Sequence, residues 1–167
     1  MTLLAGDKPT AAELELATEK IIARGRRITS TGTTTTAVAG ALRLDDLPIE
    51  GGYSYNIRVQ TSPRSSVAAD GIAVHLRYTT DGTTPSTSST ILPGGYWFVR
   101  AIAAGSAQSQ TFETEYIPAA DETLSLLLCW NRVVGTGNVD LYADSNTHTE
   151  MKVFNSGPDV GDTGTDI

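Results

Sequence analysis

The feature that most constrains the fold is a repeated alternation of apolar and polar residues with a period of two. In residues 53–60 and again in residues 72–79, apolar side chains take every second position and mostly polar residues lie between them. A period of two places the apolar side chains on one face of a β-strand. Both segments are therefore predicted to be strands that bury one face.

Further strand-like segments follow the same rule and are separated by turn residues. They cover residues 96–102, 111–117, 124–132, 139–143 and 150–154, and the threonine tract 29–36 is predicted to be an exposed strand because β-branched side chains fit the pleat. The clearest turn signal is Asp81-Gly82. About eight short strands with regular breaks predict a mostly β, jelly-roll-like β-sandwich of antiparallel strands, and a plain β-barrel is the less favoured alternative.

The N-terminal segment has a different pattern. Thr10 and Glu13 form a capping box, and residues 11–24 contain no glycine or proline before Gly25. Three apolar residues fall on one face at helical spacing: Leu14, Ala17 and Ile21. These features predict a short N-terminal α-helix that must dock on something to be stable.

The sequence thus divides into three parts. Residues 1–28 are predicted to be an N-terminal arm with the helix, and residues 29–156 the β-sandwich domain. Residues 157–167 are rich in glycine, threonine and aspartate, and are predicted to be an extended acidic tail.

One strand breaks the simple alternation. Within residues 124–132, one face carries Leu124, Leu126, Leu128 and Trp130. Leu127 and Cys129 lie on the other face, so both sides carry apolar groups. Two interpretations stay open: the second face is covered within the subunit, or it meets another subunit, because exposed apolar patches mark interfaces.

Charge and composition exclude some classes of partner. The formal net charge of −7 gives no general attraction to phosphate backbones, so nucleic acid is not an expected partner. No apolar run approaches the length of a membrane span, and no signal-peptide pattern is present. A single cysteine fits a reducing compartment, so synthesis in the cytoplasm is expected.

The residues do not form a recognisable catalytic set, and we expect neither enzymatic activity nor a cofactor. His75 and His148 are predicted to be surface histidines, and Cys129 is predicted to be an inert thiol inside an apolar run. No nucleophile elbow or zinc-ligand spacing is present. The acidic residues of the tail are predicted to be solvated rather than to bind a cation: Asp159, Asp162 and Asp166.

Two other clusters have alternative interpretations. Arg24, Arg26 and Arg27 complement the C-terminal end of the predicted helix, or dock on an acidic neighbouring subunit. The aromatic residues are favoured as core, with a sugar-stacking platform near Tyr53, Trp97 or Tyr142 as the alternative.

Four segments resemble small virion proteins of tailed phages that infect actinobacteria. They are residues 4–14 (LAGDKPTAAEL), 42–49 (LRLDDLPI), 76–85 (LRYTTDGTTP) and 159–164 (DVGDTG). The first looks like the N-terminal segment of minor tail proteins in that group. The resemblance implies a structural subunit of the particle, often trimeric, and it carries over no catalytic residue.

The expected function is therefore a surface-exposed minor tail or fibre-like protein of the virion, assembling as a symmetric oligomer (a trimer is favoured) with other virion proteins. The alternatives are a capsid decoration protein that staples capsomers, and a host-attachment module that binds cell-wall polysaccharide. The predicted assembly contacts are Leu14, Ala17, Ile21, Arg24, Arg26, Arg27, Leu127, Cys129, Asp159, Asp162 and Asp166.

Overall fold

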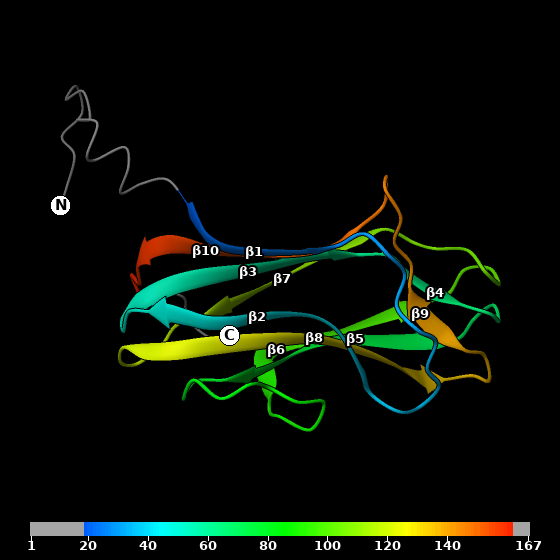
Figure 1. Cartoon of the computed structure of the whole chain (residues 1–167), viewed down its shortest axis with the longest axis horizontal. Coiled ribbons are helices and arrows are strands. Elements are labelled where there is room, and N and C mark those ends of the chain that lie inside the picture. Colours follow the sequence, from blue (N-terminus) through cyan, green and yellow to red (C-terminus); the bar gives the residue numbers. More distant parts are fainter. Residues whose placement is uncertain (1–18, 162–167) are drawn as a thin grey trace, which may run out of the picture.

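The computed structural model describes residues 19–161, and within them the chain forms ten β-strands and no helix (Figure 1). The strands are β1 (Lys20–Arg27), β2 (Ala39–Ile49), β3 (Tyr53–Thr61), β4 (Pro63–Ser65), β5 (Gly71–Thr79), β6 (Ile91–Arg100), β7 (Gln110–Tyr116), β8 (Glu122–Val134), β9 (Val139–Leu141) and β10 (Thr149–Pro158). In this part of the chain, no helix could span a membrane.

Eight of the strands form two four-stranded antiparallel sheets that pack face to face. One sheet has the order β1-β10-β3-β7 and the other the order β2-β8-β5-β6, while β4 and β9 pair at one end (Figure 1). The pairs are nested, with β1 on β10, β2 on β8, β3 on β7 and β5 on β6. The predicted mostly β sandwich is confirmed, and the nested pairing is the strand order of a jelly roll.

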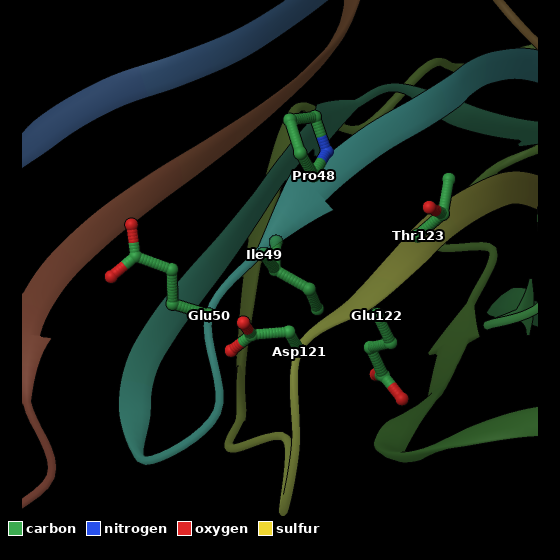
Figure 2. A pocket seen from close by; sticks show the side chains of 6 residues that line it. All are labelled: Pro48, Ile49, Glu50, Asp121, Glu122 and Thr123. Carbon is green, nitrogen blue, oxygen red and sulfur yellow. The ribbon is translucent and has the colours of Figure 1, made fainter.

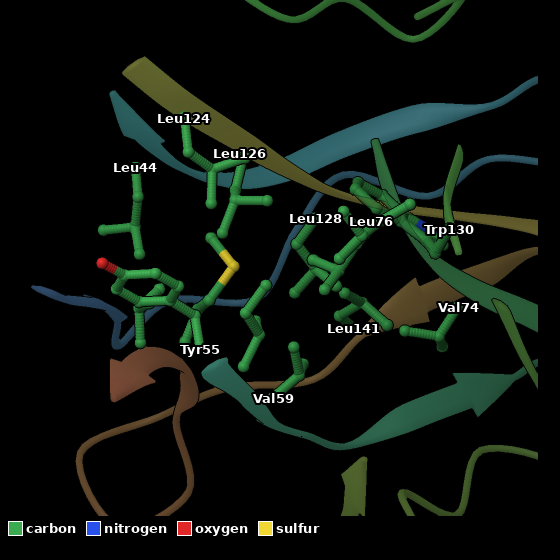
Figure 3. Packing of buried hydrophobic residues seen from close by; sticks show 14 of the residues in the cluster. Leu44, Tyr55, Val59, Val74, Leu76, Leu124, Leu126, Leu128, Trp130 and Leu141 are labelled. Carbon is green, nitrogen blue, oxygen red and sulfur yellow. The ribbon is translucent and has the colours of Figure 1, made fainter. Parts of the chain in front are cut away.

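The core lies between the two sheets and is built from the inward-facing residues of the alternating pattern. Leucines of β8 point toward Tyr55 and Val59 of β3 across the gap between the sheets (Figure 3). Trp97 of β6 stacks on Phe112 of β7, with ring centroids 4.9 Å apart, and joins the two sheets along one side. This arrangement buries one face of each sheet and leaves its other face outward.

The N-terminal helix predicted over residues 11–24 is wrong where the structure describes it. Lys20 to Arg24 belong to β1, which is an edge strand of the sandwich although the sequence assigned it to the N-terminal arm. Pairing with β10 decides the conformation, because tertiary contacts override the weak helix propensity of a short segment. Residues 1–18, which hold the capping box, lie outside the described residues.

Two strand predictions also need correction. The threonine tract is a loop rather than a strand, and Thr34 forms an isolated bridge with Val139. Further hydrogen bonds join the loop to the strands: the N–H of Thr31 donates to the carbonyl of Leu141, and the carbonyl of Thr35 accepts from the N–H of Arg132. The sequence prediction did not include β2, because Gly40, two register shifts and Pro48 disturb its alternation. A proline is tolerated there since β2 is an edge strand.

Candidate assembly surface

The two sheets present outer faces of opposite character. On the sheet β1-β10-β3-β7, Glu150 pairs with both Arg24 and Lys152, and Arg58 pairs with Glu113. We call this outer surface the paired face. The carboxyl of Glu150 is almost fully buried, and the pKa of its carboxyl is nevertheless lowered, because Lys152 and Arg24 outweigh the cost of desolvation.

The outer surface of the sheet β2-β8-β5-β6 carries a group of apolar and aromatic side chains, with Arg43, Arg77 and Arg100 on the same side. We call it the apolar face, and define it by Gly40, Ala73, His75, Tyr96, Phe98, Leu127, Cys129 and Val134. The strand register brings these residues together, since His75 lies opposite Tyr96 on one side and Cys129 on the other. Successive residues point to opposite faces of a strand, so these alternate with the core residues of the same strands.

Tyr96 and Phe98 are the most prominent side chains of the apolar face. Tyr96 is 50% exposed and Phe98 is 55% exposed, although both are large and apolar. The ring of Tyr96 stacks on that of His75, with centroids 5.8 Å apart and planes 19° apart. Phe98 covers Gly71 of the neighbouring strand, where an added Cβ would come within 2.6 Å of the ring.

Leu127 and Cys129 differ in how the subunit covers them. Cys129 is fully buried, and burial raises the pKa of its thiol to about 11. Leu127 is only partly covered, and lies against Gly40 of β2, where an added Cβ would come within 3.1 Å of its side chain. Cys129 is therefore covered within the subunit, whereas Leu127 still presents apolar surface.

His75 is buried, contrary to the prediction of a surface histidine. It is 1% exposed, and neither ring nitrogen has a hydrogen-bond partner. Burial, with the nearby charge of Arg77 as a second cause, lowers the pKa of His75 to about 4. Arg77 donates a hydrogen bond to the carbonyl of Ser89, but its Nε is also without a partner.

The other predicted contacts are dispersed. Ile21 is half exposed on β1. Arg26 lies 3.2 Å from the ring Nδ1 of His148, and Arg27 donates to the carbonyls of Thr29 and Ala41. Since Arg24, Arg26 and Arg27 lie on a strand, the interpretation as a helix-terminal charge complement is wrong.

At the C-terminal end, Asp159 continues from β10 on the surface. Its backbone N–H donates to the carbonyl of Gly52 over 2.8 Å, and its carboxylate accepts from Gly161. Four of the predicted assembly contacts lie outside the described residues: Leu14, Ala17, Asp162 and Asp166.

The aromatic residues suggested for a sugar platform do not form one. Tyr53 and Trp97 pack against the core, and the ring of Tyr142 lies under the guanidinium of Arg64. The exposed pair is instead Tyr96, which the sequence favoured as a core residue, and Phe98, which the sequence analysis did not single out. The signal was available, because an inward Trp97 and Val99 require the residues between and before them to point outward.

A hollow of about 410 Å³ at one end of the sandwich is a separate candidate (Figure 2). It is lined by Pro48, Ile49, Glu50, Asp121, Glu122 and Thr123. Asp121 accepts from the N–H of Gly51, and Glu122 accepts from the hydroxyl of Tyr116. In residues 19–161 there is no group of three potential ligands that could hold a metal ion.

Comparisons with known proteins give no sequence relative. No protein-family model matches the chain, and no curated protein matches it, so the phage resemblance gains no support from that side.

Similar solved structures include a carbohydrate-binding module, BiXyn10A CBM1, at 12% identity with a TM-score of 0.36. It matches over 80% of this chain and 98% of its own. The VP2 subviral particle of infectious bursal disease virus matches at 10% identity and a TM-score of 0.37, over 84% of this chain and 42% of its own. Eiger TNF from S. frugiperda matches at 12% identity and a TM-score of 0.34, over 89% of this chain and 99% of its own. At scores this low, none of them identifies a family or a function.

Proposed function

We propose that this protein is a non-enzymatic structural subunit of a tailed-phage virion, and that copies associate through the apolar face. The observation that carries the association is the exposure of Tyr96 and Phe98 on the same outer face as the partly covered Leu127. Apolar patches of this kind are typical of protein interfaces. The virion role rests on the sequence resemblance.

The charge distribution favours a second copy of the chain as the occupant of the apolar face. The whole chain has a formal net charge of −7, so most approaches of two copies are repulsive. On the outward side of the sheet β2-β8-β5-β6, β2 carries two exposed carboxylates: Asp45, which is ion-paired with Arg43 over 2.7 Å, and Asp46. Arg77 of β5 and Arg100 of β6 point to the same side, so carboxylates do not outnumber cations there. Two copies can therefore meet there with less repulsion than the net charge of the chain would cause elsewhere.

The finer parts of the proposal follow the resemblance. The oligomer is a cyclic trimer, displayed on the tail as a minor tail or fibre-like protein and contacting other virion proteins there. The subunit is synthesised in the host cytoplasm. Negative-stain images of virions labelled with an antibody would separate a tail position from a position on the head, where the protein would act as a capsid decoration.

The association is tested by light scattering after size exclusion at pH 7.5. We expect a mass near three times 17.6 kDa for the native protein and a monomer for Leu127→Asp, because a carboxylate would be buried in the contact. The matched control is Thr111→Asp, which adds the same charge at an exposed position of β7 and leaves the mass unchanged. A monomeric native protein would contradict the proposal.

A second candidate function is host attachment through a polysaccharide. The exposed rings of Tyr96 and Phe98, two residues apart on β6, are the specific observation in its favour, because flat aromatic rings can stack on sugar faces. We expect a Tyr96→Ser, Phe98→Ser double variant to lose retention on host cell-wall polysaccharide if this function is present. Equal retention of the native protein and the variant would exclude these rings as the platform.

A further inference from the structure

We propose that His75 and Tyr96 form an acid-operated latch in the apolar face. While His75 is neutral, its ring packs against Tyr96 and holds Tyr96 in the position in which the apolar face contacts a second copy. When His75 takes up a proton, the ring leaves its buried position, Tyr96 is displaced and associated copies separate. The inference concerns the regulation of the proposed self-association and rests on that function.

The geometry makes His75 the residue on which the face depends. Its ring stacks under that of Tyr96, which is itself half exposed and so belongs to the contact surface. The register places His75 two residues along β5 from Ala73, which lies opposite Phe98, and two residues from Arg77, which lies opposite Leu127. A movement of this ring would therefore disturb the middle of the face rather than its rim.

The surroundings of His75 offer nothing that would hold the charged form. On β6 the residue opposite is Tyr96, on β8 it is Cys129, and on β5 itself the neighbouring charge is Arg77. The thiol of Cys129 is protonated at neutral pH, because burial raises its pKa. Arg77 is positive and is not ion-paired with any described carboxylate, so it repels a second positive charge.

The lack of hydrogen-bond partners for the ring nitrogens of His75 also favours its neutral form. A neutral imidazole carries one N–H donor and one acceptor, and an imidazolium carries two donors. Neither ring nitrogen has a partner in the buried position, so protonation would add a second unsatisfied donor as well as a charge. Both needs are met by water once the ring moves outward. The low pKa of His75, about 4, agrees with this preference for the neutral form.

The test uses the full chain and the fact that it has two histidines. Light scattering at pH 7.5, 6.0, 5.0, 4.0 and 3.5 is expected to show the native oligomer dissociating to monomer as the pH falls through the pKa of His75, about 4. His75→Phe keeps an aromatic ring beneath Tyr96 and is expected to remain oligomeric at the lowest of these values. His148→Gln, the matched control on the surface near Arg26, is expected to dissociate like the native protein.

A second measurement tests the coupling between His75 and Tyr96 in a variant that is expected to be monomeric. In the Leu127→Asp variant, NMR titration follows the ring signals of both histidines and of Tyr96. We expect His75 to titrate near its lowered pKa of about 4, and the Tyr96 signals to shift with the midpoint of His75. If the Tyr96 signals do not change while His75 is protonated, the latch is refuted, even if the native oligomer dissociates in acid.

The outcomes separate the two ideas. A native protein that is already monomeric at pH 7.5 refutes the proposed self-association, and the NMR titration then decides the latch alone. Native protein and His75→Phe that dissociate in parallel refute the latch and leave self-association standing. Dissociation of the native protein only, together with coupled Tyr96 signals, supports both.

Discussion

The paired face and the apolar face are the outer faces of two four-stranded sheets, but they expose different kinds of side chain. On the paired face, Arg58 with Glu113 and Glu150 with its two cations give each charged group a partner next to water. On the apolar face, Tyr96 and Phe98 cover their neighbours but leave half of their own surface exposed. This difference is the basis of our proposal that another copy of the chain covers the apolar face, whereas the paired face needs no partner.

The largest effect that would test this difference is expected from the pH dependence of His75. Its pKa is about 4 in the folded chain and about 6.5 in the unfolded chain, so between these values the unfolded chain binds the proton that the folded chain does not. Stability is therefore lost as the pH falls from about 6.5 toward about 4, by up to about 3 kcal/mol. Urea unfolding of the native protein and of His75→Phe should differ in this way, and parallel pH profiles would contradict the buried neutral histidine.

The next largest effect is expected on the paired face. Glu150→Ala removes a nearly buried carboxylate that joins Arg24 of β1 to Lys152 of β10, and we expect a loss of about 2 kcal/mol in the free energy of unfolding at pH 7. The residue stays charged over the working range because its pKa is lowered, so the loss should shrink as the carboxyl is protonated in acid. A loss below about 0.5 kcal/mol would mean that the pairing contributes no more than an exposed ion pair does.

A smaller effect is expected from Phe98→Ala on the apolar face. The ring is half exposed, but it covers the backbone of Gly71, which has no side chain to shield it. We therefore expect the free energy of unfolding of the monomer to fall by about 1 kcal/mol. The measurement is best made in the Leu127→Asp background, where association does not contribute. A stability loss seen only in the oligomer would assign Phe98 to the contact alone.

The smallest effect is expected where a charge pair is exposed. Arg58 and Glu113 are both more than a third exposed, so Glu113→Gln should change the free energy of unfolding by no more than about 0.5 kcal/mol. Thermal unfolding at low and high salt would check this, because the small contribution should vanish with screening. If Glu113→Gln lowered the free energy of unfolding as much as Glu150→Ala, the buried and the exposed ion pairs would contribute equally to stability.

The alternating pattern predicted most of the strands, because burial of one face imposes a period of two on the residues themselves. It failed at β2, where Gly40 and Pro48 disturb the alternation, and at β1, where a segment with helical spacing pairs with β10 instead. The candidate surface was found in part. Leu127 was recognised from the two-faced strand, whereas Tyr96 was predicted to be core and Phe98 was not singled out. Residues 96–99 are apolar on both sides of the strand, so the alternation groups Tyr96 with Phe98 but only the packing of the sheets decides that this pair faces outward.

Periodicity, net charge and composition are read from the sequence alone, and they were enough to establish that this chain is mostly β and acidic. The tertiary structure was needed to place His75 beneath Tyr96, to bring Arg24 to Glu150, and to leave aromatic rings uncovered on one sheet. These facts depend on which strands are neighbours. Strand pairing joins residues more than a hundred positions apart, as in Arg24 and Glu150, and no local pattern encodes that choice.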